Sequence, residues 1–458
     1  MACFTCRWRS LFIYLCTSCI SLFLLFVYGI MVFCFVLNKL ERSTVVASSP
    51  VRFVAPGTFS NGSFNPLPET FWSLRRHEDA IWNRLQLSMD RHFNPILRPR
   101  NIKTGSRNRS SYESLRTQAF SDVTDLAKMR KSFDRLPRIR EFVSHMHRRD
   151  YPALIQPVGG CGAGTTDERE APLLLLAIKS TEMNFKNRQA IRQTWGQVGR
   201  VAGQWSNRKG GGRGGGHVRR VFLLGNGDAG VRLSEALQME SERHGDVLQW
   251  DFRDTFFNLT MKDVLFWSWL SRSCKRTLFV FKGDDDVFVN TPRMVAFLLD
   301  QLKKPQAHKT IGDFMTGDVI TAGLANRVRR SKYFIPYGFY QGVYPMYAGG
   351  GGVVYSGLLA RRLLHVSERV HLFPIDDVYV GMCMVRINAR PVHHPAFLTF
   401  DFPHGEEEKR CSYHTILLVH KRSPAQIVKL WARLKMSQAQ CRDTPLRRAG
   451  EKENKPEP

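Results

Sequence analysis

Between residues 171 and 440, short apolar runs alternate with longer stretches of helix-like periodicity, and this alternation constrains the fold of the 458-residue chain more than any other feature. The apolar runs predict buried strands, and the longer stretches predict helices. The strands are expected at Leu173–Ile178, Val218–Leu224, Val247–Trp250, Thr277–Phe281, Met315–Ile320 and Val353–Tyr355, and the helices at Asn184–Trp195, Leu233–His244, Asn258–Ser273, Leu358–Val366 and Asp377–Ile387. This pattern is typical of an α/β domain whose mainly parallel sheet is covered by helices on both faces. Ligands of such sheets bind beyond the carboxyl ends of the strands, so functional residues are expected there.

The N-terminal region contains a segment without charged residues, from Ser10 to Asn38. A helix of this length exceeds the roughly 30 Å hydrocarbon core of a bilayer, so the segment predicts a signal-anchor helix behind a short tail at residues 1–9. The alternative is a cleaved signal peptide with a cut near residues 46–49, although its apolar region would usually span about 7–15 residues. Basic residues flank the segment on both sides and leave its orientation open.

The chain is strongly basic, with 67 Lys and Arg against 40 Asp and Glu and a formal net charge of +27. This excess indicates a polyanionic partner: nucleic acid, an anionic membrane surface or a phosphate-bearing substrate. A Gly- and Arg-rich stretch at residues 199–220 can be interpreted as an RGG-like RNA-binding segment or as a flexible surface insertion. Its place inside a folded domain behind a membrane anchor favours the insertion and argues against nucleic acid.

Cysteines and sequons beyond the anchor favour an oxidising, lumenal compartment. Five cysteines follow the anchor, at Cys161, Cys274, Cys383, Cys411 and Cys441. Because five is an odd number, the simplest arrangement is two disulfides and one remaining thiol. Three N-x-S/T sequons lie on the same side, at Asn61, Asn108 and Asn258.

Three regions are expected beyond the anchor. Residues 39–150 form a stem and leading segment in which two helical patches are predicted, around Thr70–Arg91 and Asp122–His147. Residues 151–441 form the α/β domain. Residues 442–458 are polar and contain proline, which predicts a disordered tail.

An acidic run follows the strand at Thr277–Phe281: Asp284, Asp285 and Asp286 stand next to one another. Three carboxylates at the end of a strand repel one another unless a cation or basic groups compensate. A hard divalent ion with oxygen ligands is one solution, and Mg²⁺ or Mn²⁺ usually completes its coordination with substrate phosphates and water. The alternative is a solvated acidic turn, or a helix cap.

Three later features are each ambiguous alone. Asp376 and Asp377 open a helix, where one carboxylate could serve as an N-cap or as a general base. Four glycines at residues 349–352, after Tyr347, would either form a flexible turn or bring the backbone close to a ligand. His420 is either structural or a metal ligand.

Together these stretches resemble the β-1,3-glycosyltransferase family of the Golgi, in family order over about residues 170–435. The matching stretches are LLLLAIKS, RQAIRQTWG, VFLLG, DFRDTFFNLTMK, FVFKGDDDVFVN, YPMYAGGGGVVYSG, FPIDDVYVGMC and CSYHTILLVHKR. The forms AIKS and YAGGGG favour the β-1,3-N-acetylglucosaminyltransferases that extend poly-N-acetyllactosamine. The resemblance implies a single-pass type II Golgi membrane protein with a lumenal GT-A catalytic domain. It implies UDP-N-acetylglucosamine as donor, and a terminal β-galactose of a glycoprotein or glycolipid glycan as acceptor.

The resemblance also assigns roles to individual residues. Asp286 and His420 would hold Mn²⁺ or Mg²⁺, and Asp377 would be the catalytic base, with Asp376 and Tyr347 supporting the acceptor or the catalysis. The donor would be bound by Lys179, Arg188, Arg192, Asp284, Asp285, Gly350 and Gly351. The disulfides it implies are Cys161–Cys274 and Cys383–Cys411, which leaves Cys441 unpaired.

Three alternatives compete with this assignment. A β-1,3-galactosyltransferase using UDP-galactose would keep the same fold and metal site. The second alternative is a non-catalytic lumenal glycan-binding protein, and the presence of both Asp286 and Asp377 argues against it. The third alternative is an RNA-binding protein, and the predicted anchor and the sequons argue against it. The oligomeric state, as a homo-oligomer or with other glycosyltransferases, stays open.

Overall fold

A computed structural model of the chain describes residues 28–31, 52–54, 64–66, 79–93, 133–157, 160–163, 171–204, 214–227, 231–403 and 405–448. Residues 1–52 and 53–458 are two separate units. In the first unit, residues 28–31 are helical. No helix among the described residues is long and apolar enough to cross a membrane, and nearly all of the anchor predicted at 10–38 lies outside them. Two short strands, β1 (Arg52–Val54) and β2 (Phe64–Pro66), pair with each other.

The second unit is built on a large mixed sheet whose centre is parallel. Its described strands run in the order β12-β10-β11-β8-β4-β6-β7-β3, with β5 paired to β6. Their bounds are β3 Ala153–Ile155, β4 Leu174–Lys179, β5 Gly199–Ala202, β6 Gly215–Asn226, β7 Val247–Arg253, β8 Phe279–Asp284, β10 Met315–Ile320, β11 Tyr347–Ser356 and β12 Val392–His393. The central strands β8, β4, β6 and β7 are parallel, whereas β11 and β3 join them antiparallel. The predicted α/β class with a mostly parallel central sheet is therefore confirmed.

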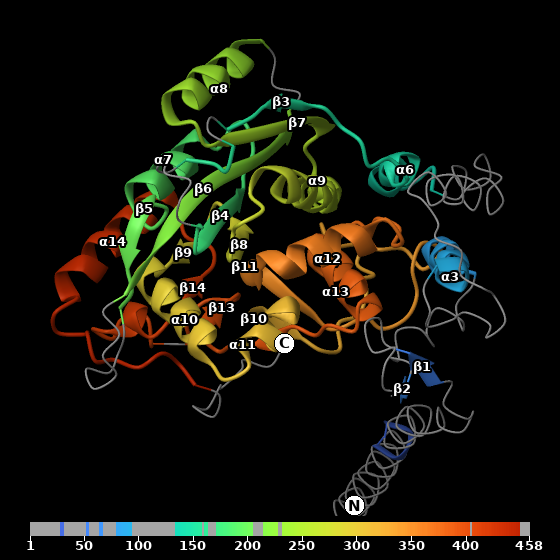
Figure 1. The fold of residues 1–458 in the computed structure, drawn as a ribbon. Coiled ribbons are helices and arrows are strands. Elements are labelled where there is room, and N and C mark those ends of the chain that lie inside the picture. The colour runs from blue at the N-terminus through green and yellow to red at the C-terminus, as the bar shows by residue number, and fades with distance from the viewer. Residues whose placement is uncertain are drawn as a thin grey trace, which may run out of the picture. The chain divides into compact units, whose positions relative to one another are not determined.

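Helices cover both faces of this sheet (Figure 1). One face packs against α9 (Leu259–Ser273), α12 (Gly357–Ser367) and α13 (Asp376–Arg386). The other packs against α7 (Phe185–Gln193), α10 (Thr291–Lys303) and α14 (Pro424–Ser437). The short helix α11 (Ala307–Thr310) follows α10, and α8 (Val231–His244) precedes β7. A small sheet of β13 (Phe397–Leu398), β14 (Leu418–Val419) and β9 (Phe288–Val289) lies beside α10 in Figure 1.

Alternation along β4 shows how the sequence divides between the two faces. Leu174, Leu176 and Ile178 belong to the core under α7, α10 and α14. Leu175 and Ala177 belong to the core under α9, α12 and α13. Because side chains alternate along a strand, Lys179 comes next on the second face, where α13 begins.

Two helices of the predicted stem are part of the folded domain. Helix α6 (Pro137–His145) lies within its predicted patch, and α3 (Ile81–Phe93) overlaps the other patch and ends two residues beyond it. Trp82 Nε1 donates to Leu372 O at 3.0 Å, and the buried Asp90 pairs with Arg386 of α13 at 2.6 Å. The boundary predicted at residue 151 is therefore too late.

Two further boundaries differ from the prediction. The ends of the Gly- and Arg-rich insertion form a hairpin, because β5 pairs antiparallel with the start of β6, while residues 205–213 lie outside the described residues. Residues 442–448 of the predicted disordered tail are held to the domain: Arg293 donates to Thr444 O at 2.8 Å, and Arg447 N donates to Thr415 O at 2.9 Å.

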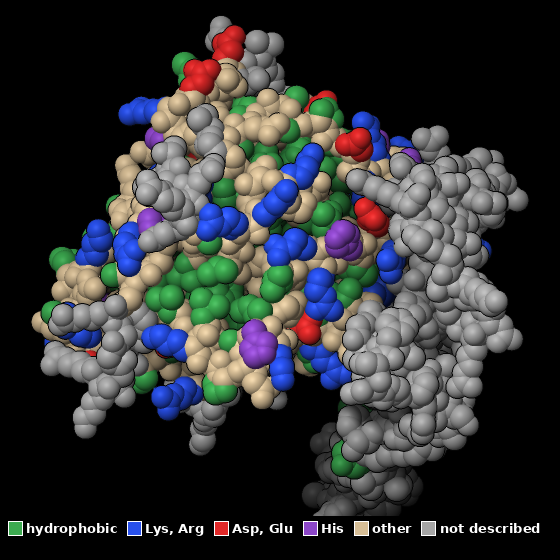
Figure 2. Space-filling model, in the orientation of Figure 1, with side chains coloured by type: hydrophobic (Ala, Val, Ile, Leu, Met, Phe, Trp, Pro, Cys, Tyr) green, Lys and Arg blue, Asp and Glu red, His purple; other side chains and the backbone are tan. Residues whose placement is uncertain are grey.

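The visible face of the domain in Figure 2 carries many more Lys and Arg than Asp and Glu side chains. This distribution agrees with the strong positive charge of the sequence.

Candidate functional site

The carboxyl end of β8 and the start of α13 bring the predicted carboxylates to one place. In the register of the sheet, Lys179 of β4 lies directly opposite Asp284 of β8. The Lys179 Nζ is 3.0 Å from Asp284 Oδ1 and 2.7 Å from Asp376 Oδ2. Burial disfavours the charge on Lys179, but Asp284 and Asp376 outweigh it and raise its pKa well above the ordinary value. Lys179 thus links the acidic end of β8 to the carboxylate pair.

Asp284, Asp286 and His420 form a cluster that could hold a metal ion, with their ligand atoms within 4.8 Å of one another. His420 Nε2 lies 3.2 Å from Asp286 Oδ1 and 3.8 Å from Asp284 Oδ2. Two carboxylates and an imidazole are suitable ligands for Mn²⁺ or Mg²⁺. The structure therefore joins two residues predicted as ligands and adds Asp284, which was predicted to contact the donor.

The second ring nitrogen of His420, Nδ1, has a hydrogen-bond partner in the backbone. Nδ1 lies 3.3 Å from Thr399 O, a bond that would fix the tautomer and leave Nε2 for a cation. Burial lowers the pKa of His420, but the hydrogen bond and the charge of Asp286 outweigh it, so the pKa is raised.

The four glycines lie inside β11 rather than in a turn, and they make room for this histidine. A Cβ on Gly351 would lie 2.8 Å from the His420 ring and 2.5 Å from Val287. A Cβ on Gly350, whose φ is +84°, would lie 2.1 Å from Thr399 Oγ1. The missing side chains thus admit His420 and its partner Thr399, and donor contact by these glycines stays a prediction.

The two carboxylates of α13 differ in environment. Both lie in the first turn, because Ile375 is the N-cap, so neither caps the helix. Burial works against the charge on Asp376, but Lys179 and Lys282 lower its pKa far below the ordinary value. Burial and the neighbouring Asp376 raise the pKa of Asp377 to about 8. Its side chain is 18% exposed, so Asp377 is the member of the pair that a substrate can reach.

Asp285 points away from this cluster. It is buried, and its Oδ2 accepts hydrogen bonds from Ser180 Oγ at 2.6 Å and Asn184 Nδ2 at 2.9 Å. Asn187 Nδ2 donates to its backbone carbonyl at 3.2 Å. These bonds anchor the acidic run to α7, which is a structural role that the sequence did not indicate.

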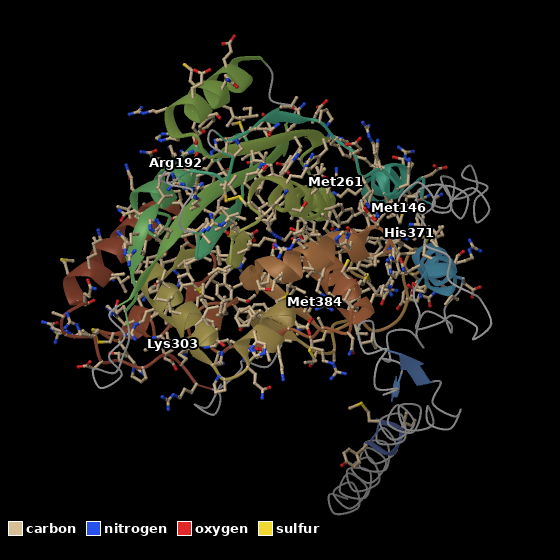
Figure 3. All side chains as sticks on the ribbon, in the orientation of Figure 1. Met146, Arg192, Met261, Lys303, His371 and Met384 are labelled. Carbon is tan, nitrogen blue, oxygen red and sulfur yellow. A yellow bond between two sulfur atoms is a disulfide. The ribbon has the colours of Figure 1, made fainter. Side chains whose placement is uncertain are left out.

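Arg188 and Arg192 lie on α7, and both side chains make hydrogen bonds to other groups of the protein. All five N–H groups of Arg188 have acceptors: both oxygens of Glu240, Ser180 Oγ, Thr181 O and Glu182 O. Arg192, which is labelled in Figure 3, bonds to Glu240 and to both oxygens of Asp246. Every guanidinium hydrogen of Arg188 thus has an acceptor within the protein, and the donor contacts predicted for Arg188 and Arg192 stay predictions.

Tyr347 and the loop at residues 321–346 border the site. Burial and the charge of Asp377 raise the pKa of Tyr347 to about 12, so Tyr347 lies close to Asp377, and its supporting role stays a prediction. In the loop, the exposed Tyr333 packs edge-on against Phe256 at 5.1 Å, and Lys332 Nζ lies 5.0 Å from both rings. The positive charge of Lys332 also favours the ionised form of Asp286.

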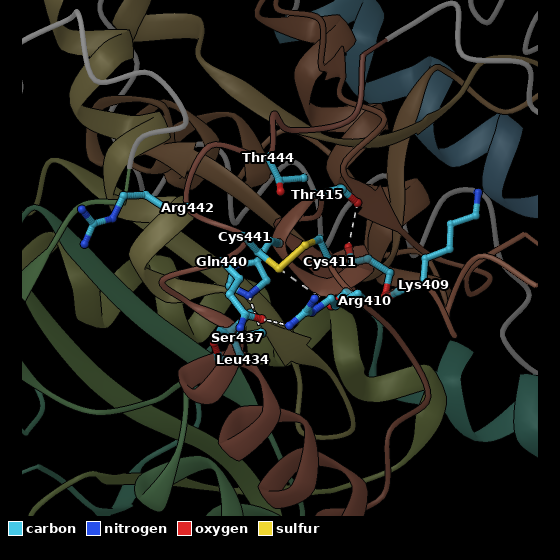
Figure 4. Close-up of a disulfide and its surroundings, with 12 residues drawn as sticks. Lys409, Arg410, Cys411, Thr415, Leu434, Ser437, Gln440, Cys441, Arg442 and Thr444 are labelled. Atoms are coloured by element: carbon cyan, nitrogen blue, oxygen red, sulfur yellow. Dashed lines mark hydrogen bonds between the residues drawn. A yellow bond between two sulfur atoms is a disulfide. The ribbon is translucent and has the colours of Figure 1, made fainter.

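One predicted disulfide forms and the other is wrong. Cys161 is bonded to Cys274, as predicted, whereas Cys411 is bonded to Cys441 (Figure 4). Cys383 is a free thiol buried in the core under α9, α12 and α13, and burial raises its pKa to about 12. The prediction failed because α14 carries Cys441 back to Cys411 on the other face of the sheet.

Only one predicted sequon lies among the described residues. Asn258 is partly exposed at the start of α9, and its Nδ2 donates to Arg253 O at 2.8 Å. Asn61 and Asn108 lie outside the described residues. Glycosylation at all three positions stays a prediction.

Sequence reasoning missed the second buried lysine and its partner. Lys282 Nζ is 2.7 Å from Asp263 Oδ2 and 3.9 Å from Asp377 Oδ1. One signal was available: Lys282 stands two residues before Asp284 and therefore faces the same side of β8. Asp263 lies in a largely apolar stretch of α9, where Val264, Leu265, Phe266 and Trp267 follow it.

A mostly parallel sheet with an acidic metal-type cluster at the end of a strand, beside a carboxylate pair on a facing helix, defines a glycosyltransferase-like class of protein. Sequence comparison agrees, since the galactosyltransferase family profile matches residues 186–395. The chain is 41% identical over 377 residues to human N-acetyllactosaminide β-1,3-N-acetylglucosaminyltransferase 2, covering 81% of this chain and 89% of the relative. It is 39% identical to human N-acetyllactosaminide β-1,3-N-acetylglucosaminyltransferase 4, covering 68% of this chain and 75% of that relative. It is 41% identical to UDP-GlcNAc:βGal β-1,3-N-acetylglucosaminyltransferase 9 of Bos taurus, covering 62% of this chain and 71% of that relative.

The chain therefore belongs to the galactosyltransferase family, among its β-1,3-N-acetylglucosaminyltransferases. The solved bifunctional glycosyltransferase WbbM overlaps 61% of this chain and 53% of its own, with a TM-score of 0.29 and 10% identity. That likeness is too weak to bear on the assignment.

Proposed function

We propose that the protein transfers N-acetylglucosamine from UDP-N-acetylglucosamine to the 3-hydroxyl of a terminal β-galactose. The observation that carries this proposal is the link through Lys179, which joins the metal-type cluster to the carboxylate pair within hydrogen-bond distance. A leaving-group site and a base thus lie side by side. The relatives that cover most of the chain are named for this reaction.

The reaction inverts the anomeric centre. The galactose 3-oxygen forms a bond to C1 of the donor sugar while the bond from C1 to the diphosphate oxygen breaks, and its electron pair leaves with UDP. Asp377 accepts the hydroxyl proton, a role typically worth about 10²–10⁴-fold in rate. Bound at Asp284, Asp286 and His420, Mn²⁺ or Mg²⁺ would neutralise charge on the leaving diphosphate. No enzyme nucleophile is required.

Residues near Asp377 suit the acceptor side. Tyr333 and Lys332 border the site from the loop at residues 321–346, and both pack against the ring of Phe256, which lies just before α9. A sugar has an apolar face and polar edges, so it can pack against such rings while its hydroxyls reach charged groups. These neighbours support an acceptor site between this loop and Asp377.

The segment at residues 10–38 would anchor the protein in the Golgi membrane as a single-pass type II protein, with the catalytic domain in the lumen. Two disulfides support an oxidising compartment. Protease protection of the catalytic domain in intact Golgi vesicles tests this topology, and digestion without detergent would contradict it.

A donor comparison tests the reaction. The full-length protein in detergent with Mn²⁺ and a β-galactoside should transfer N-acetylglucosamine, and excess EDTA or Asp286→Ala should abolish the transfer. Preferred transfer of galactose would favour the β-1,3-galactosyltransferase alternative. Full activity in EDTA would contradict the metal site.

A further inference from the structure

A buried ion pair lies beneath the catalytic carboxylates and has no part in the reaction as proposed. Lys282 Nζ is 2.7 Å from Asp263 Oδ2, and the two side chains are 3% and 0% exposed. The same ammonium is 3.6 Å from Asp376 Oδ2 and 3.9 Å from Asp377 Oδ1. Only the first of these distances is a hydrogen bond, so Lys282 attracts Asp377 without donating to it.

Stability is a weak reason for this pair. Replacing a buried ion pair with apolar side chains is often neutral or stabilising. Asp263 also lowers the stability of the fold, because its buried Oδ1 has no hydrogen-bond partner among the described residues. Helix α9 is otherwise apolar on this side, with Phe266 and Trp267 buried in the same core. The pair therefore calls for a role connected with the neighbouring carboxylates.

We propose that Asp263 and Lys282 are a positioning pair that sets how tightly Asp377 holds its proton. This inference rests on the proposed function, in which Asp377 is the base. Asp263 keeps the Lys282 ammonium at a distance where its charge partly offsets that of Asp376. A released ammonium would bond to the α13 carboxylates and weaken the base, whereas a missing ammonium would make Asp377 hold its proton more tightly and leave less of its ionised form near neutral pH.

The other charged groups around Asp377 do not replace this pair. From α13 itself, Asp376 repels the ionised form, and Asp284 at the end of β8 does the same. Lys179 of β4 attracts it, but Lys179 is already bonded to Asp376 and Asp284. Tyr347 of β11 is neutral, because the pKa of its hydroxyl is raised to about 12. Of the two lysines near Asp377, Lys179 is held by two carboxylates, whereas Lys282 has one carboxylate within hydrogen-bond distance, that of Asp263.

Variants of the two residues should act in opposite directions. Lys282→Met should move the midpoint for proton binding at Asp377 up by about one pH unit or more, since an opposite charge at this range lowers a carboxyl pKa by about 1–3 units. Asp263→Asn should move it down. The double variant Lys282→Met/Asp263→Asn leaves no unpaired charge and should move the midpoint up by less than Lys282→Met does.

Two measurements on the full-length protein report this midpoint. The first is the acid limb of the kcat–pH profile with saturating donor, acceptor and Mn²⁺. The second needs no turnover: in EDTA, the pH dependence of thermal stability is compared between each variant and the same variant carrying Asp377→Asn. If the parent transfers no sugar, the proposed function fails, while the second measurement still decides this inference.

A matched control separates positioning from general damage. Asp254 pairs with the buried Lys262 of α9 at 2.8 Å, and neither residue is among the main contributors to the pKa of Asp377. Asp254→Asn should lower stability and leave the midpoint unchanged. The inference is overturned if the single variants leave the midpoint in place or move it in the same direction. Should both single variants fail to fold, an unmoved midpoint in the double variant overturns it.

Discussion

At the residue scale, Asp377 is the most sensitive position for turnover. Asp377→Asn is nearly isosteric but cannot accept a proton, so kcat should fall by about 10² or more while the KM for the donor changes little. Steady-state kinetics with both substrates varied will measure this. A large loss in Asp376→Asn with near-normal turnover in Asp377→Asn would show that the base is the other carboxylate.

The same substitution should stabilise the fold. A carboxyl whose pKa rises from 3.8 to about 8 on folding binds its proton more tightly in the native state. Its favourable contribution is present at low pH and is lost as the pH rises from about 4 to 8. The gain in Tm of Asp377→Asn over the parent in EDTA should therefore grow across this window. A gain that is flat or falls with pH would contradict the raised pKa.

Substitutions in the glycines of β11 test how closely the backbone fits around His420, the proposed metal ligand. In Gly351→Ala the new methyl would lie 2.8 Å from the His420 ring, so we expect Mn²⁺ affinity to fall by about 10–100-fold. In the control Gly312→Ala the methyl meets nothing within 4 Å, and affinity should stay unchanged. Titration calorimetry with Mn²⁺ measures both. Parent-like affinity in a folded Gly351→Ala protein would count against His420 as a ligand.

At the scale of elements, the Cys411–Cys441 bond ties the end of α14 to the segment that leads to His420. Its partners are 30 residues apart, so the chain-entropy account gives about 3–4 kcal/mol of stabilisation. Cys441→Ser should lower the Tm accordingly, whereas Cys383→Ser should leave the disulfide pattern intact. Non-reducing peptide mapping and thermal unfolding check both. A Cys383–Cys411 peptide in the native protein would refute this arrangement.

Element order and the carboxylate sites followed from the sequence because local patterns determine them. The run of three aspartates follows a strand, and the pair opens a helix, so their positions at the sheet edge could be predicted. Which cysteine meets Cys411 could not be predicted, since that depends on where α14 packs against the sheet. The burial of Arg188 likewise depends on Glu240, which lies on a different element.

At the scale of the whole molecule, α3 is an integral part of the catalytic domain. Asp90 and Arg386 form a pair with 0% and 2% exposed side chains. Asp90→Asn would remove the carboxylate that bonds to a buried guanidinium and should cost about 3–5 kcal/mol of stability. The exposed pair of Asp134 and Arg140 provides the control, because Asp134→Asn should cost about 0–1 kcal/mol. Equal unfolding midpoints for the two variants would show that α3 is dispensable.

The stem boundary illustrates what composition cannot reveal. Residues 39–150 are poor in regular periodicity as a whole, which predicts a stem, but α3 contributes Ile81, Trp82 and Leu85 to the core. Short helices gain most of their stability from packing, and their partners here lie almost 300 residues away along the chain. A local pattern could locate the helix but could not show where it packs.

The central claim is that one inverting step, with Asp377 as base, joins N-acetylglucosamine to galactose. NMR of the product formed by the full-length protein from UDP-N-acetylglucosamine and a β-galactoside tests it most directly. The account predicts a single new β linkage to the galactose 3-oxygen, formed at least about 10²-fold more slowly by Asp377→Asn. An α linkage, a bond to another hydroxyl, or the same product from Asp377→Asn at the parent rate would contradict it.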